Sequence, residues 1–127
     1  MNSSMGNFII KKTSTGVMFN LKAGNGEIIA SSEVYSSRSA CEKGVESVRK
    51  NAVAAKVEDQ TVDGYTPLTN PKFEIYLDEG GRFRFRLKAQ NGGLLIYSEG
   101  YTAKANCKNG IDSVRRNAPD ATVNIIE

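Results

Sequence analysis

The chain contains one segment twice. Residues 19–52 and residues 85–118 align at a constant offset of 66 without a gap, and 16 of the 34 aligned positions are identical. Such self-similarity predicts two copies of one supersecondary unit. A unit of about 55 residues buries too little surface to be comfortably stable alone. We therefore expect the two copies in these 127 residues to share one hydrophobic core.

Each copy reads as three strands, a helix and a fourth strand. Apolar residues alternate along the strand segments, and the Asn-Gly pairs at 25–26 and 91–92 predict tight hairpin turns with positive φ at both residues. The expected strands are residues 7–12, 17–23, 27–34 and 54–58, and then 72–77, 83–89, 94–100 and 121–126. Residues 60–71 contain two prolines and a glycine, which is typical of a linker. Repeat 1 is thus residues 7–59, repeat 2 is residues 72–127, and residues 1–127 form one pseudo-twofold domain.

A helix follows each hairpin, because the apolar period changes there from 2 to 3.6. The inward faces are expected to carry Cys41, Val45, Val48 and Ala52, and then Cys107, Ile111, Val114 and Ala118. Ser36 or Ser37, and Thr102, are the expected N-caps, while Asn51 and Asn117 suit left-handed helix ends. Gly44 and Gly110 lie in mid-helix, where glycine costs up to ~1 kcal/mol. They predict a close approach of the helix to the sheet or to the partner helix.

The segments F-x-L-K-A-x-N-G, S-E-x-Y-[ST] and G-[VI]-x-S-V-[RK]-x-N-A occur in both copies. They resemble the YegP-like family of small bacterial proteins, and the resemblance covers nearly the whole chain. It implies an α+β fold, in which two βββαβ units form one antiparallel sheet with two helices on one face and exchange their last strands. A monomer that is an internal pseudo-dimer is expected. The resemblance implies no activity, cofactor or catalytic residue.

The composition excludes several kinds of chemistry. Histidine is absent, which removes the commonest general base and most transition-metal sites. There is no Cys-x-x-Cys pair and no glycine-rich phosphate loop. We therefore expect no cofactor, no metal and no enzymatic activity, and predict a binding or structural protein. The two cysteines are expected to be buried and reduced, although a disulfide between the repeats is an open alternative.

The segment S-E-x-Y contains the strongest polar candidates for a catalytic site. Glu33 and Glu99 occupy equivalent positions and could form a symmetric carboxylate pair in a small enzyme. The competing interpretation is that each glutamate pairs with a cross-strand base or lies near a helix N-terminus.

A basic strand in repeat 2 suggests a binding face. The residues expected on the face away from the helices are Arg82, Arg84, Arg86 and Lys88, with Tyr97, Tyr101, Glu99 and Leu95 opposite them. Arginines neutralise phosphate and tyrosines stack on bases, so this face could hold single-stranded nucleic acid or another polyanion. A protein partner and an ordinary solvated face are the alternatives. Repeat 1 lacks the pattern.

The N-terminal residues have neither a basic segment nor an apolar one. No stretch approaches the length of a membrane span. A cytoplasmic location without membrane contact is the resulting expectation.

Overall fold

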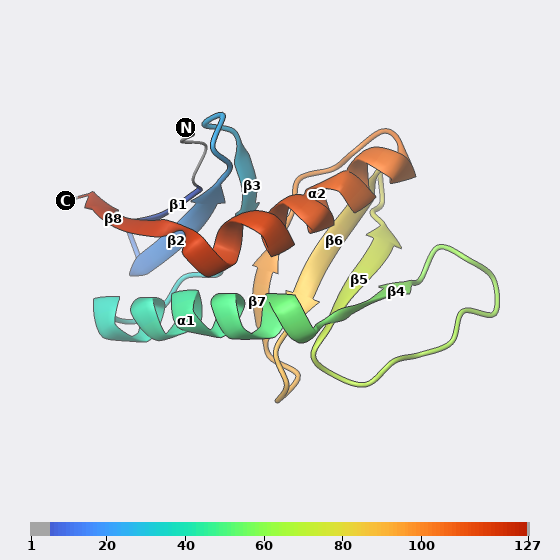
Figure 1. Cartoon of the computed structure of the whole chain (residues 1–127), viewed down its shortest axis with the longest axis horizontal. Helices are drawn as coiled ribbons and strands as arrows, with labels where there is room; N and C mark the ends of the chain where they lie inside the picture. Colours follow the sequence, from blue (N-terminus) through green and yellow to red (C-terminus); the bar gives the residue numbers. More distant parts are fainter. Residues whose placement is uncertain (1–5, 127) are drawn as a thin grey trace.

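The computed structural model describes residues 6–126, which form one eight-stranded sheet and two α-helices (Figure 1). The elements of repeat 1 are β1 (Asn7–Lys12), β2 (Val17–Lys22), β3 (Ile28–Ser31), α1 (Arg38–Ala54) and β4 (Lys56–Asp59). Those of repeat 2 are β5 (Lys72–Leu77), β6 (Phe83–Lys88), β7 (Leu94–Tyr97), α2 (Lys104–Asn117), the 3₁₀ turn η1 (Ala118–Asp120) and β8 (Thr122–Ile126). Both helices cover the same face of the sheet, which confirms the predicted α+β architecture.

The repeats exchange their last strands, as predicted. The strand order is β4-β5-β6-β7-β3-β2-β1-β8, so β4 of repeat 1 lies beside β5 of repeat 2, and β8 lies beside β1. Both of these pairings are parallel, whereas the other strand pairs are antiparallel. The sheet is therefore mixed and not wholly antiparallel. Residues 60–71 connect the parallel partners β4 and β5, and most of the chain separates β1 from β8; such long connections permit a parallel pairing that a short hairpin does not.

The pseudo-twofold axis passes through the middle of the sheet. There β3 and β7 meet at the pair Ser31 and Tyr97, which occupy equivalent positions in the two copies. On the helix side, four fully buried phenylalanines repeat the symmetry. Phe8 meets Phe19 edge-on at 5.6 Å between ring centroids, and Phe73 meets Phe85 at 6.0 Å. One core therefore spans both repeats.

Two arginines tie the helix of each repeat to the far end of the other. The Arg49 guanidinium donates to the carbonyl oxygens of Ala118 and Pro119, and the Arg115 guanidinium donates to that of Ala55. Each guanidinium also lies 5.2 Å from the centre of a core phenylalanine ring. These contacts stabilise the joint between the repeats, because they satisfy carbonyl groups at the helix ends.

Both cysteines are buried and unpaired, as expected from their place on the inward helix faces. Burial, followed by the nearby acids Glu42 and Asp59, raises the pKa of the Cys41 and Cys107 thiols to about 11. Because the thiolate is the reactive form, the structure favours a packing role for these residues.

The hairpin turns differ from the expected primed type. Gly26 and Gly92 have φ near 87° and 86°, but no other residue type among residues 6–126 has a positive φ. The hydrogen bonds from Gly26 N to Ala23 O and from Ala23 N to Glu27 O define a three-residue loop with a glycine bulge. A further register shift follows in each return strand, and it places Leu95 in the core and not on the outer face.

The helix ends agree only in part with the sequence pattern. Ser37 caps α1 by accepting from Ala40 N, but Ala103 stands at the N-cap of α2, so Thr102 is not the cap. Asn51 and Asn117 were expected in left-handed conformation, and this is wrong because both continue the helix. Neither described helix is long and apolar enough to cross a membrane.

Candidate functional site

Both helices cover one face of the sheet, so the opposite face is open (Figure 1). Charged residues of β5 and β6 form ion pairs on this open face. One row of cross-strand partners runs from Glu58 on β4 through Glu74, Arg86 and Tyr97 to Ser31. We call the part formed by β4 to β7 the basic face, after its arginines and lysines. The structure thus places Arg84, Arg86 and Lys88 of β6 on one surface with Tyr97, as their alternation in sequence predicts, and Arg82 directly precedes this strand.

Two of the four basic residues are held by carboxylates. Arg84 Nε lies 2.6 Å from Asp78 Oδ2, and the same guanidinium donates to the carbonyl of Ser98. Arg86 Nε lies 2.6 Å from Glu74 Oε1, and its guanidinium stacks on the Tyr76 ring at 4.2 Å. These contacts fix the direction of both guanidinium groups and neutralise part of their charge.

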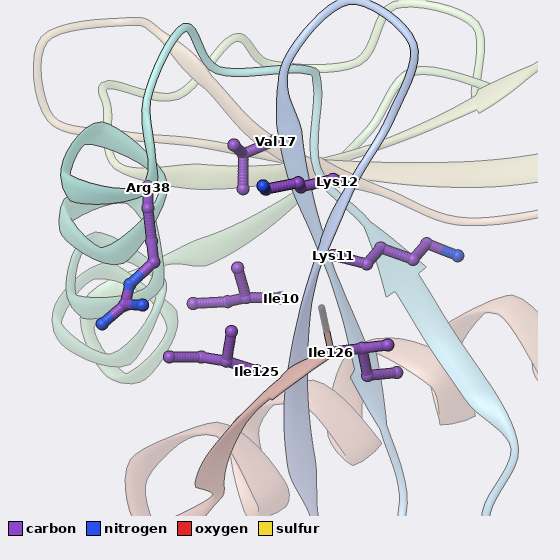
Figure 2. A pocket seen from close by; sticks show the side chains of 7 residues that line it. All are labelled: Ile10, Lys11, Lys12, Val17, Arg38, Ile125 and Ile126. Carbon is purple, nitrogen blue, oxygen red and sulfur yellow. The ribbon is translucent and has the colours of Figure 1, made fainter.

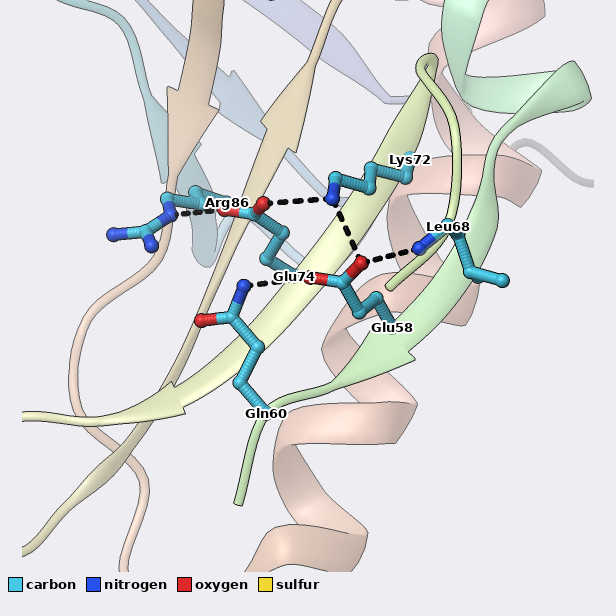
Figure 3. Close-up of polar contacts among 6 residues, drawn as sticks. All are labelled: Glu58, Gln60, Leu68, Lys72, Glu74 and Arg86. Atoms are coloured by element: carbon cyan, nitrogen blue, oxygen red, sulfur yellow. Dashed lines mark hydrogen bonds and ion pairs between the residues drawn. The ribbon is translucent and has the colours of Figure 1, made fainter. Parts of the chain in front are cut away.

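Behind Arg86 lies a buried ion-pair network (Figure 3). Lys72 Nζ bridges the carboxylates of Glu58 and Glu74 at 2.7 and 3.3 Å. Glu58 is 3% exposed, and it also accepts hydrogen bonds from the Gln60 side chain and the Leu68 backbone N–H. The linker therefore folds back over the edge of the sheet and excludes water from the network.

The pKa of Glu58 is lowered by the hydrogen bonds that this buried carboxylate accepts. Burial by itself raises the pKa, but the hydrogen bonds from Lys72, Gln60 and Leu68 outweigh it and lower the pKa to about 2. The pKa of Glu74 is also lowered, because hydrogen bonds from Arg86 and Lys72 outweigh the effect of burial. Both groups are therefore carboxylates at neutral pH, and they hold the cations of the basic face in place.

Acid unfolding tests this network. Because the folded-state pKa of Glu58 is about 2 and its ordinary value is 4.5, ionised Glu58 stabilises the fold above pH 4.5. That contribution is lost as the pH falls from 4.5 to 2. We expect the Glu58→Gln variant to lack it, so that its unfolding free energy depends on pH less steeply, by up to about one proton. Urea unfolding between pH 5 and pH 2 measures this, with exposed Glu79→Gln as the control; equal slopes for wild type and Glu58→Gln would contradict it.

Arg82 and Lys88 are the basic residues left available. Arg82 is exposed and Lys88 is half-buried, and neither forms an ion pair with any residue from 6 to 126. Tyr97 lies beside Arg86 across the strand pair and is 37% exposed. Arg82, Lys88 and Tyr97, together with the free edge of the Arg86 guanidinium, can meet a ligand without breaking the network.

Tyr101 does not belong to the basic face, and its expected position is wrong. The Ser98 hydroxyl accepts from Phe85 N and donates to Glu99 O, so that it inserts into the strand ladder. After this insertion Tyr101 pairs with Phe83 and turns toward the helices, where its ring packs against Gly110 of α2. Ser32 and Tyr35 repeat this arrangement in repeat 1. Serine and tyrosine of S-E-x-Y are therefore architectural.

The two glutamates of the same motif are not brought into a shared pocket. Glu33 and Glu99 are both exposed. Glu99 lines a hollow with Glu27, Ile29 and Tyr101, and not with Glu33. The arrangement needed for a symmetric acid–base pair is thus missing at these positions. Among residues 6–126, no three cysteine, aspartate or glutamate side chains gather to hold a metal ion.

The equivalent half of the outer face has a different character. Asn20, Ser31 and Met18 stand where repeat 2 has Arg86, Tyr97 and Arg84. The Ser31 hydroxyl donates to the Asn20 side chain at 2.8 Å, and Asn20 is buried. The arginines and the tyrosine of the basic face therefore come from repeat 2 alone.

Sequence reasoning did not identify the acidic half of the network or Tyr76. Lys72, Glu74 and Tyr76 alternate along β5, and this period-2 pattern was the available signal. Their contact with Glu58, however, depends on the pairing of β4 with the other repeat.

Comparison with known proteins places the chain in a family. A family model described as "Domain of unknown function (DUF1508)" matches residues 13–59 and again residues 78–124. The UPF0339 protein YegP of Yersinia pestis is 41% identical over 115 residues, which are 90% of this chain and 89% of that one. A UPF0339 protein of Methanosarcina acetivorans is 52% identical over 56 residues, 44% of this chain but 97% of the relative, so that relative is one repeat long.

The solution structure of yegP from E. coli, a protein of unknown function, has the same fold. It superimposes with a TM-score of 0.79 at 32% sequence identity, over 98% of this chain and 96% of the other. With the repeated match to the family model and the full-length relatives, the chain belongs to the UPF0339/YegP family, as a tandem pair of DUF1508 domains.

Proposed function

We propose that the protein is a non-enzymatic binding protein that holds single-stranded nucleic acid on its basic face. The observation that carries the proposal is the open outer face at β6 and β7, where exposed Tyr97 stands beside the oriented guanidinium of Arg86. An aromatic ring offers a surface on which any base stacks, and adjacent cations follow the phosphate backbone. This combination favours sequence-tolerant binding.

The ion pairs limit the strength of such binding. Asp78, Glu74 and Glu58 offset part of the positive charge, so the electrostatic attraction comes mainly from Arg82, Arg86 and Lys88. With about three phosphate contacts, the affinity should fall roughly tenfold to twentyfold between 50 and 200 mM salt. Fluorescence anisotropy with a labelled 16-mer at both salt concentrations measures this.

Three variants separate the contributions to binding. Arg82→Gln and Lys88→Gln should each weaken binding and reduce the salt dependence, because each removes one phosphate contact. Tyr97→Ala should cost about 1–3 kcal/mol of binding free energy and leave the salt dependence nearly unchanged, because stacking is not ionic. Arg86 is left unchanged because its removal would leave the buried Glu74 carboxylate without the nearer of its two ion-pair partners.

Lys22→Gln is the matched control, since Lys22 occupies the position of Lys88 in repeat 1. It should leave binding unaffected. No binding at 100 μM protein, or an equal loss from the Lys22 and Lys88 variants, would refute the proposed function and favour a solvated face.

A further inference from the structure

Each repeat has a corner where the N-terminal end of its helix meets an edge strand of the sheet. Side chains fill this corner in repeat 2 but not in repeat 1. At the N-terminal end of α2, Lys104 Nζ lies 2.9 Å from Asp59 Oδ2 on the edge strand β4. The same ammonium group lies 5.9 Å from the centre of the Phe83 ring. A cation, a carboxylate and an aromatic ring thus complete this corner of the sheet.

The equivalent corner of repeat 1 has kept the cation and lost the other two groups. At an offset of 66, Arg38 replaces Lys104, Ile125 replaces Asp59, and Val17 replaces Phe83. The smaller valine leaves a groove of about 180 Å³, lined by Ile10, Lys11, Lys12, Val17, Arg38, Ile125 and Ile126. We call it the edge groove.

The groove is apolar at its floor and cationic at its rim. Figure 2 shows Ile10 and Ile125 pointing toward Arg38, with Lys12 extending to the same side. The ion pair that Arg38 forms within residues 6–126 is an exposed one with Glu42, four residues along α1 at 3.2 Å. Such a surface pair is worth little, so the guanidinium can turn to a carboxylate in the groove.

The strand beside the groove is an unprotected sheet edge. β8 is the last strand of the sheet, and β1 is its partner among the described strands. Its apolar residues Val123, Ile125 and Ile126 are 39%, 39% and 55% exposed. The opposite edge, β4, carries Glu58 under the folded-back linker. An exposed apolar edge with unpaired backbone groups is the surface to which extended peptides add.

We propose that the edge groove binds an extended segment of a partner protein, which adds to β8 as a further strand. The segment places an aromatic or large aliphatic side chain against the exposed Ile125, so that it covers the groove from its open side. Two residues along, on the same face, it presents a carboxylate to Arg38 and Lys12, as Asp59 does to Lys104. The partner is thus an acidic, apolar strand, and the filled corner of repeat 2 indicates its chemistry.

A designed peptide tests the site on the full chain. The probe is a short fluorescein-labelled peptide with threonine at every second position. Phenylalanine and aspartate occupy two of the positions in between, two residues apart, so that both lie on the same face of the strand. Fluorescence anisotropy should show saturable binding with Kd below about 1 mM. Replacing the aspartate with asparagine should weaken binding about tenfold, and methylating alternate backbone nitrogens should abolish it, because strand addition needs those N–H groups.

Protein variants locate the binding. Arg38→Gln should weaken binding of the aspartate peptide about tenfold and affect the asparagine peptide little. Val17→Phe combined with Ile125→Asp gives repeat 1 the groups that fill the corner of repeat 2, so it should abolish binding while the fold is retained. Urea unfolding checks that the doubly substituted protein folds. Lys104→Gln, at the filled corner, is the matched control and should leave binding unchanged.

Three results of the binding assays would overturn the proposal. These are no binding at 1 mM protein, equal binding of the N-methylated peptide, and unchanged binding by the folded double variant. A dimer of the full chain that dissociates in the double variant would assign the groove to a second copy, and would also overturn it. Since the basic face lies on β6 and β7, failure here would leave nucleic-acid binding by Arg82 and Tyr97 unaffected.

Discussion

Residues 1–64, expressed alone, are expected not to fold as a monomer. In the whole chain β4 pairs with β5, β3 meets β7, and β1 lies against β8, so the fragment loses all three partners. It also loses the carbonyl groups that Arg49 contacts at the end of α2. A single repeat leaves too much of its core exposed for stability in this size range.

The fragment should therefore be either a dimer or a chain without cooperative unfolding. In a dimer a second copy supplies the missing strands, and the one-repeat length of the Methanosarcina relative fits this arrangement. Sedimentation equilibrium gives the mass, and urea unfolding followed by circular dichroism gives the cooperativity. A monomeric fragment with a cooperative transition would show that the exchanged strands are dispensable, with the full chain as the reference.

Replacing Gly110 with leucine should lower the free energy of unfolding by about 1–3 kcal/mol, although helix propensity alone predicts a gain of up to ~1 kcal/mol. A Cβ atom on Gly110 would lie 2.6 Å from Tyr101 Oη and 2.9 Å from Phe85 Cε2. At Gly44 it would meet the Tyr35 hydroxyl, and it would lie 3.3 Å from Phe19 Cε2. The predicted close approach is thus to the sheet face, and overpacking should outweigh propensity.

Denaturant midpoints of Gly110→Leu and Gly44→Leu decide between the two effects. Lys108→Leu, at an exposed position of α2, is the control and should change stability little. In a Tyr101→Ala background the cost of Gly110→Ala should shrink, because the nearest obstructing group is gone. If both leucine variants were more stable than wild type, close packing would not be the reason for the glycines.

The sequence alone determined the parts of this protein that depend on local periodicity. The repeat predicted two units and one core, the alternating and helical patterns predicted the elements, and Leu87 opposite Ile96 followed from the hairpin. The burial of Cys41 and Cys107 followed in the same way. These features are readable because neighbouring residues in the chain decide which face each side chain takes.

Tertiary structure decided the features that involve a change of register or a contact between repeats. The Ser98 hydroxyl takes a place in the ladder, and this one insertion moves Tyr101 from the outer face to the helix side. Because strand side chains alternate with period 2, a single extra residue reverses the face of everything after it. No local sequence pattern predicts such an insertion.

The charge of the basic face was decided in the same way. The sequence pattern predicts that Arg86 lies on the outer face. Its partner Glu74, however, is held by Lys72, which also binds Glu58, and this contact depends on the pairing of β4 with β5. That pairing joins different repeats, so its contacts are set by the strand exchange and not by sequence neighbours. The unfilled corner at Arg38 also depends on the tertiary structure. Only the fold shows that it occupies the same place in repeat 1 as the filled corner at Lys104 does in repeat 2.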